Sequence, residues 1–258
     1  MRKLLAIAGN TVREALRERL LYNLLVFALL LVLGSLTISK LTLGEQSRII
    51  TNIGTGATQL FGTLIAVFLG VGLLTRELDR RTCYPVLARP VSRAAFVVGK
   101  YLGLLATLAL NVALMAVATA AMLFLYRSDV GWVGPQFLGT FALMVAQLAV
   151  CGAFAVLFTT FSTATLAAIF SLALVGAGWL FSEVRTFWLE ADQVGLKTVV
   201  RLLDFLLPNM GLLDMKEAVL YGDPVTLGSF LGRLLYGTAY SATVVALAAL
   251  VFSRRDVR

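Results

Sequence analysis

The longest stretch without a charged residue runs from Val130 to Ser182 and contains 53 residues. About 20 apolar residues are enough for one helix to cross the hydrocarbon core of a membrane. The stretch is therefore too long for one crossing, and it is long enough for two crossings joined by a turn. The natural place for that turn is a polar cluster, Thr159, Thr160, Ser162 and Thr163. We expect spanning helices near 136–158 and 164–181.

The rest of the chain follows the same pattern. Of its 258 residues, 59% are hydrophobic and 14% are charged, whereas a soluble domain has about 25% charged residues. A soluble protein could not bury so much apolar surface, so the composition predicts an all-α integral membrane protein, with 1–258 forming one transmembrane domain. Four further apolar runs bring the expected number of spanning helices to six. They lie at 20–38, 57–75, 101–126 (beginning near Ala94) and 230–252.

The distribution of charge predicts the orientation. With six spans and both termini in the cytoplasm, 14 of the 22 basic residues but only five of the 14 acidic ones lie inside. Cytoplasmic loops of membrane proteins carry an excess of Lys and Arg. The count therefore favours cytoplasmic N- and C-termini in a multi-pass protein of the cytoplasmic (inner) membrane, with a bacterial source expected.

The first 19 residues have the pattern of an amphipathic helix. Apolar side chains recur at helical spacing, whereas Arg and Glu side chains occupy the other side. Such a helix lies in the membrane interface with its basic face on the lipid headgroups. The alternative is a plain positively charged flank. A signal peptide is not expected, because the apolar run that follows is too long and no small-residue cleavage site ends it.

Residues 183–229 form the one sizeable polar insertion, which the charge count places outside the cell. Asp192 can cap a helix that runs to 207, and Asp214 with Glu217 resembles a capping box for a second short helix. The first helix has an apolar face that must be buried against the spans, in the outer headgroup layer or against an external partner. A lid over the exit is one reading, and simple packing on the bundle is the other. The residues that would form the lid are Val200, Leu203 and Pro208.

Residues 76–100 form a basic segment between two apolar runs. Six of its residues are basic and two are acidic, and Pro85 and Pro90 bend it. Ser92 is a candidate N-cap for the helix that follows. Charge alone leaves two readings open: a topology anchor, and a docking surface for a cytoplasmic partner.

The sequence lacks the residues that several classes of activity require. The chain has no His, its two Cys residues give no disulfide framework or metal spacing, and the middles of the six spans carry no charge. The phosphate-binding pattern GxxxxGK[ST] is missing, because Gly99 and Lys100 are followed by Tyr101. The net charge of +8 follows the membrane, so nucleic acid is not an expected partner. We therefore expect no enzyme activity in this chain, and energy for any transport must come from a partner.

The layout of six spans, an amphipathic N-terminal helix and this basic segment resembles the ABC-2-type permeases, the membrane subunits of ATP-binding-cassette exporters. The resembling residues are Glu77, Arg81, Thr82, Leu87, Pro90, Ser92, Arg93, Gly99 and Lys100. The family pattern reads E-x-x-x-x-T, then P-x-S-R and G-K after the second span. The outer residues 207–209 and 221–222 also look like the branch that contains the nitrous-oxide-reductase maturation permease.

The resemblance implies a mechanism. Two copies of the chain would pair, and each would dock its segment 76–93 into a cytoplasmic ATPase subunit that binds ATP and Mg, so no cofactor is expected in this chain. The first, second and fifth spans would line the pathway, the N-terminal helix would act as a lever, and the outer insertion would cap the exit. The residues expected to couple to the ATPase are Glu77, Arg80, Arg81, Thr82, Leu87, Pro90, Ser92 and Arg93. The alternatives are a membrane anchor or assembly factor that transports nothing, and transmission of force to an extracytoplasmic partner.

Overall fold

The computed structural model describes residues 2–39, 46–79, 92–127, 134–190, 207–217 and 226–254. Within these ranges the chain is helical and contains no strand, which confirms the all-α class. The elements are α1 (Arg2–Ala15), α2 (Arg19–Ser39), α3 (Gln46–Asp79), α5 (Arg93–Arg127), α6 (Pro135–Thr159), α7 (Ala164–Glu190), the 3-10 turn η2 (Gly211–Leu213) and α10 (Leu227–Arg254).

The helices have the length and composition of membrane spans. In the described part of the chain five of them, α3, α5, α6, α7 and α10, are long and apolar enough to cross a membrane. Helix α2 coincides with the expected first span but has a shorter apolar stretch, Leu21–Ser35. The integral membrane class is thus confirmed, whereas the number of six spans and their orientation stay predictions.

Helix α3 begins earlier than expected. The sequence placed Arg48 in a polar loop and the span near Ala57, but the helix already begins at Gln46 and contains 34 residues. At 1.5 Å per residue it is about 50 Å long, more than the hydrocarbon core needs. Some hydroxyl groups in its early turns bond to carbonyl oxygens of the same helix. Thr55 Oγ1, for example, donates to the Thr51 carbonyl oxygen at 2.8 Å.

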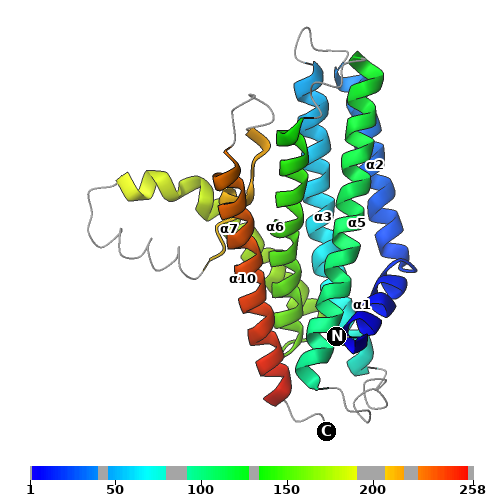
Figure 1. Ribbon diagram of the computed structural model, residues 1–258, viewed down its shortest axis with the longest axis vertical. Helices are drawn as coiled ribbons and strands as arrows, with labels where there is room; N and C mark the ends of the chain where they lie inside the picture. Colours follow the sequence, from blue (N-terminus) through cyan, green and yellow to red (C-terminus); the bar gives the residue numbers. More distant parts are fainter. Residues whose placement is uncertain are drawn as a thin grey trace.

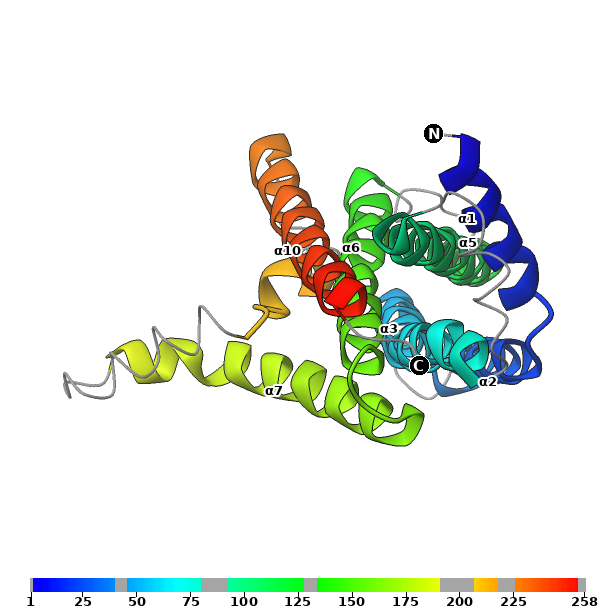
Figure 2. The ribbon, with the colours of Figure 1, turned by 90° about the horizontal axis from the view of Figure 1, so that it is seen from below.

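Helix α6 lies at the centre of the bundle, between α3, α5 and α10 (Figure 2). Close approach depends on glycines of α3. A Cβ atom on Gly62 would lie 2.6 Å from a methyl group of Leu148, and one on Gly70 would lie 2.8 Å from the Cβ of Ala155. The turn from α6 to α7 falls at residues 160–163, where the polar cluster predicted it.

Helix α7 leaves the bundle at an angle (Figure 1). Near its start Ala167 packs in a small apolar cluster with Val67 and Val71 of α3. Further along the helix Leu180 is 69% exposed. Helix α7 also continues to Glu190, past the expected end of the fifth span at 181, so the beginning of the predicted insertion is helical.

Candidate functional site

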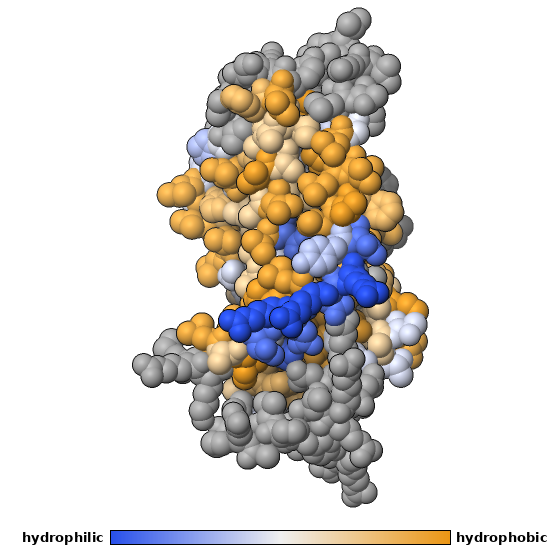
Figure 3. All heavy atoms as spheres, turned by 90° about the vertical axis from the view of Figure 1, so that its right-hand side faces the viewer, coloured by the Kyte–Doolittle hydropathy of each residue, from blue (hydrophilic) through white to orange (hydrophobic). Residues whose placement is uncertain are grey.

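Helix α1 lies across one end of the bundle. Figure 3 shows its hydrophilic surface as a band that runs crosswise beneath the apolar belt of the spans. The amphipathic helix is therefore present, but the buried face is centred differently from the apolar pattern. Thr11 and Ala15 are buried, whereas Leu5 is 69% exposed. In a membrane that exposed Leu side chain is available to lipid.

Two glycines of α5 receive α1. A Cβ atom on Gly103 would lie 2.8 Å from the carbonyl oxygen of Ala8, and one on Gly99 would lie 2.9 Å from Cγ2 of Ile7. Small residues spaced four apart allow two helix backbones to approach closely. In the sequence this GxxxG pair is a weak signal in an apolar protein. In the structure it is the surface on which α1 packs.

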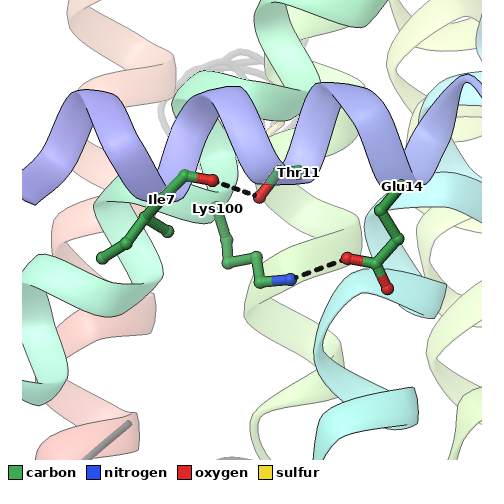
Figure 4. A network of polar contacts seen from close by, with 4 residues as sticks. All are labelled: Ile7, Thr11, Glu14 and Lys100. Carbon is green, nitrogen blue, oxygen red and sulfur yellow. Dashed lines mark hydrogen bonds and ion pairs between the residues drawn. The ribbon is translucent and has the colours of Figure 1, made fainter.

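An ion pair closes the same contact. Lys100 Nζ lies 3.1 Å from Glu14 Oε2, and the Lys100 side chain is only 2% exposed (Figure 4). The ammonium also lies 6.0 Å from the centroid of the Phe96 ring. A buried charge is costly unless it is paired. The Glu14–Lys100 pair therefore fixes the position of α1 along α5.

The C-terminal end of α1 also lies beside α3. A small cavity there is lined by Glu14, Ala15 and Glu18 on one side and by Leu69, Gly72 and Leu73 of α3 on the other. Helices α1, α3 and α5 thus meet at one end of the bundle. We call this meeting point the α1 junction. Its contacts lie at residues 69–73 of α3 and 99–103 of α5, six to ten residues from the helix ends Asp79 and Arg93.

The structure places some of the predicted coupling residues. Ser92 is the N-cap of α5, as predicted, because its Oγ accepts a hydrogen bond from the Ala95 N–H at 3.2 Å. Glu77 lies in the last turn of α3, and Arg93 is the first residue of α5. The others lie outside the described residues: Arg80, Arg81, Thr82, Leu87 and Pro90.

At the other end, residues 207–217 enter the bundle; we call them the inserted segment. The Met210 carbonyl oxygen accepts a hydrogen bond from Gln147 Nε2 at 3.4 Å, and the Met215 carbonyl oxygen accepts one from Thr140 Oγ1 at 3.3 Å. Gln147 is 12 residues into α6, or about 18 Å along its axis. The sequence placed these residues in an insertion outside the spans, but their backbone bonds to the middle of a span.

Helices α7 and α10 hold the inserted segment from two other sides. A Cβ atom on Gly178 of α7 would lie 2.8 Å from the carbonyl oxygen of Pro208, which is buried. The Asn209 N–H donates to the Tyr236 hydroxyl oxygen of α10 at 2.9 Å. Of the predicted lid residues, Pro208 thus packs within the bundle, and Val200 and Leu203 lie outside the described residues.

Asp214, one of the two residues of the predicted capping box, bonds locally. Its Oδ1 accepts a hydrogen bond from the Lys216 N–H at 2.8 Å, just before the helical residues 216–217. Arg233 Nη1 donates to the Asp214 carbonyl oxygen at 3.0 Å, and this bond ties the inserted segment to α10.

The described ranges contain no set of metal ligands, because no three Asp, Glu or Cys side chains come together there.

A family model described as ABC-2 family transporter protein matches residues 5–257. The match is to the family as a whole and does not reach the nitrous-oxide-reductase branch. A search of curated proteins found no match.

Proposed function

Because the chain belongs to the ABC-2 family of transporter proteins, we propose that it is the permease subunit of an ABC exporter, driven by a separate cytoplasmic ATPase subunit. We place it in the cytoplasmic membrane of a bacterium, with the α1 junction on the cytoplasmic side. The ATPase subunit would bind ATP and Mg.

The α1 junction is the observation that carries this proposal. The residues between Asp79 and Ser92 connect α3 to α5 along the chain, and α1 packs on Gly99 and Gly103, six and ten residues into α5. A push on this segment is therefore transmitted to three helices together. A family permease needs such a connection, because ATP binding moves the cytoplasmic subunits whereas the cargo is handled between the spans.

The ion pair makes α1 and α5 move as one body. Separating them would leave Lys100 buried without Glu14, and breaking a buried pair typically costs about 3–5 kcal/mol. Helix α1 then acts as a lever in the interface, with its basic residues on the headgroups and its other face fixed to α5.

We assign the pathway to the surface between two copies of the chain. Helices α2 and α7 have large apolar side chains that the bundle does not cover, including Phe27 (61% exposed) and Leu180. With α3, they correspond to the first, second and fifth spans. We place the lid at the inserted segment and its neighbours, so that opening would require rearrangement of the bonds from Gln147 and Tyr236.

The test is charge reversal at the ends of the coupling segment. Glu77→Lys and Arg93→Glu are expected to reduce recovery of the ATPase subunit on co-purification in detergent, or to uncouple ATP hydrolysis from transport. The reason is that losing one partner of a desolvated pair typically costs about 2–5 kcal/mol. Arg254→Glu, at the exposed end of α10, is the matched control.

If both reversals left complex recovery and transport-linked ATPase activity unchanged, the segment would be only a topology anchor. A stable complex that hydrolyses ATP but moves no cargo would instead favour transmission of force to an extracytoplasmic partner. Failure to recover any ATPase subunit with the wild-type chain would favour the membrane anchor.

A further inference from the structure

Helix α3 carries a polar stripe in its outer half, which the apolar pattern of the sequence does not reveal. Asn52, Gly56, Gln59 and Thr63 are spaced four, three and four residues apart, which places them on one face of the helix. Polar groups in a membrane-spanning helix are costly, and they commonly face a cavity, a partner or a ligand. The next question is therefore which groups of neighbouring segments lie beside this stripe.

A cation from the inserted segment reaches this stripe. Lys216 Nζ lies 3.9 Å from the place that a Cβ atom on Gly56 would occupy, so the glycine leaves room for the ammonium group. The backbone of Lys216 is fixed by its hydrogen bond to Asp214 Oδ1, and Asp214 is itself held by Arg233. No carboxylate in the described part of the chain forms an ion pair with the Lys216 ammonium.

One turn along the stripe, a second donor is unused. Gln59 Nε2 is buried and has no hydrogen-bond partner among the described residues. A buried donor left unpaired costs about 1–3 kcal/mol. The unpaired amide donor on this face of α3 and the unpaired ammonium that reaches it from the inserted segment together suit a ligand that has several acceptor oxygens and a negative charge.

The position of these residues along α3 indicates the level in the membrane at which the ligand would bind. Gly56 precedes Asp79 by 23 residues, or about 35 Å of helix, slightly more than the thickness of the hydrocarbon core. If the end of α3 marks the cytoplasmic boundary, Gly56 lies at the level of the outer headgroups. The contacts of helix α6 indicate the same level, because the inserted segment, which contains Lys216, is bonded to Thr140 in the second turn of α6.

We propose that Lys216, Gly56 and Gln59 form a binding site for a phosphate-bearing ligand in the outer half of the protein. The ammonium supplies the charge, Gln59 supplies a second donor, and Gly56 supplies the space. The phosphate can belong to an anionic lipid headgroup or to a soluble compound. Binding itself does not require transport, whereas the role of the site in handling cargo rests on the proposed exporter function.

The test uses the purified full-length chain in detergent, with short-chain phosphatidylglycerol and inorganic phosphate as probes. Binding is measured by isothermal titration. We expect Lys216→Met to raise the Kd for phosphatidylglycerol about tenfold, because a hydrogen bond to a charged group contributes about that factor. Lys216→Arg should keep most of the affinity, and Lys197→Met is the control for an equal change in net charge.

The glycine provides an independent variant. Gly56→Val should weaken binding because its added methyl groups enter the space of the ammonium. Gly56→Ala should bind like the wild type, because its Cβ atom would meet Lys216 Nζ at the ordinary contact distance of 3.9 Å. This pair keeps the proposal testable if Lys216→Met fails to fold.

Competition by inorganic phosphate at a comparable Kd would identify a soluble ligand, whereas phosphatidylglycerol binding without such competition would identify a lipid headgroup. Two results would overturn the site: no saturable binding of either probe to the wild type, or unchanged affinity in folded Lys216→Met and Gly56→Val. The binding test uses the purified chain without an ATPase subunit. A failed co-purification of the ATPase subunit would therefore remove the transport role of the site and leave the binding result standing.

Discussion

At the scale of single residues, Lys100 shows how one buried charge defines a helix junction. It lies on α5, where the side chain is almost fully removed from solvent, and its partner Glu14 is 86 positions away in the sequence. Glu14 is 35% exposed, so solvent stabilises it more than it stabilises Lys100. The two partners are therefore unequal, and loss of the Glu side should harm the protein through the Lys that remains.

We predict that Glu14→Gln lowers the free energy of unfolding by about 3 kcal/mol, the lower end for a broken buried pair, because Glu14 is partly exposed. The double variant Glu14→Gln/Lys100→Met should recover part of that loss, since the buried charge is removed together with its partner. Denaturant unfolding in detergent measures both, and the difference gives the coupling of the pair. Equal losses in the single and the double variant would show that the pair does not fix α1.

At the scale of elements, the contact between α1 and α5 places side chains of α1 on the backbone of α5 at two glycines. Thr11 satisfies its own hydroxyl within α1, by donation to the Ile7 carbonyl oxygen at 2.9 Å. It can therefore lie against Gly103 without an unpaired polar group. Association of helices in a membrane depends on this kind of close packing, because lipid tails are as apolar as the side chains they replace.

We predict that Gly103→Ala destabilises the protein by about 1–3 kcal/mol, the usual cost of overpacking, because its Cβ atom would press on the Ala8 carbonyl oxygen. Gly232→Ala in α10 is the matched control: nothing lies within 4 Å of its added Cβ atom, and alanine is the better helix former. Thermal unfolding of both purified variants gives the comparison. A Gly103→Ala variant as stable as the control would show that α1 does not dock closely on α5.

At the scale of the whole molecule, the described termini support an even number of crossings. Helix α1 and the C-terminal end of α10 lie at the same end of the bundle (Figure 1). The same end holds the exit of α3 and the entry of α5. Placing this end in the cytoplasm puts the basic segment 76–100 and both termini on the side where Lys and Arg accumulate.

We predict that a cysteine at position 197 reacts with an impermeant reagent on whole cells, and that one at position 89 does not. The experiment uses Lys197→Cys and Arg89→Cys in a background from which Cys83 and Cys151 have been removed. Labelling of both in broken cells is the control for expression. Labelling at 89 but not at 197 in whole cells would reverse the orientation.

The sequence by itself determined the class, the approximate positions of the long apolar helices, the turn at 160–163 and the cap at Ser92. These features depend on the hydropathy of contiguous residues or on bonds that reach two or three positions along the chain, so the local sequence contains them. Only the tertiary structure decided that Gly99 and Gly103 receive α1, that Lys100 pairs with Glu14, and that Lys216 reaches Gly56. A membrane helix is apolar on all sides, so its pattern does not show which face meets which neighbour. The inserted segment was missed for the same reason, because the groups that bond its polar backbone come from α6 and α10, far away in the sequence.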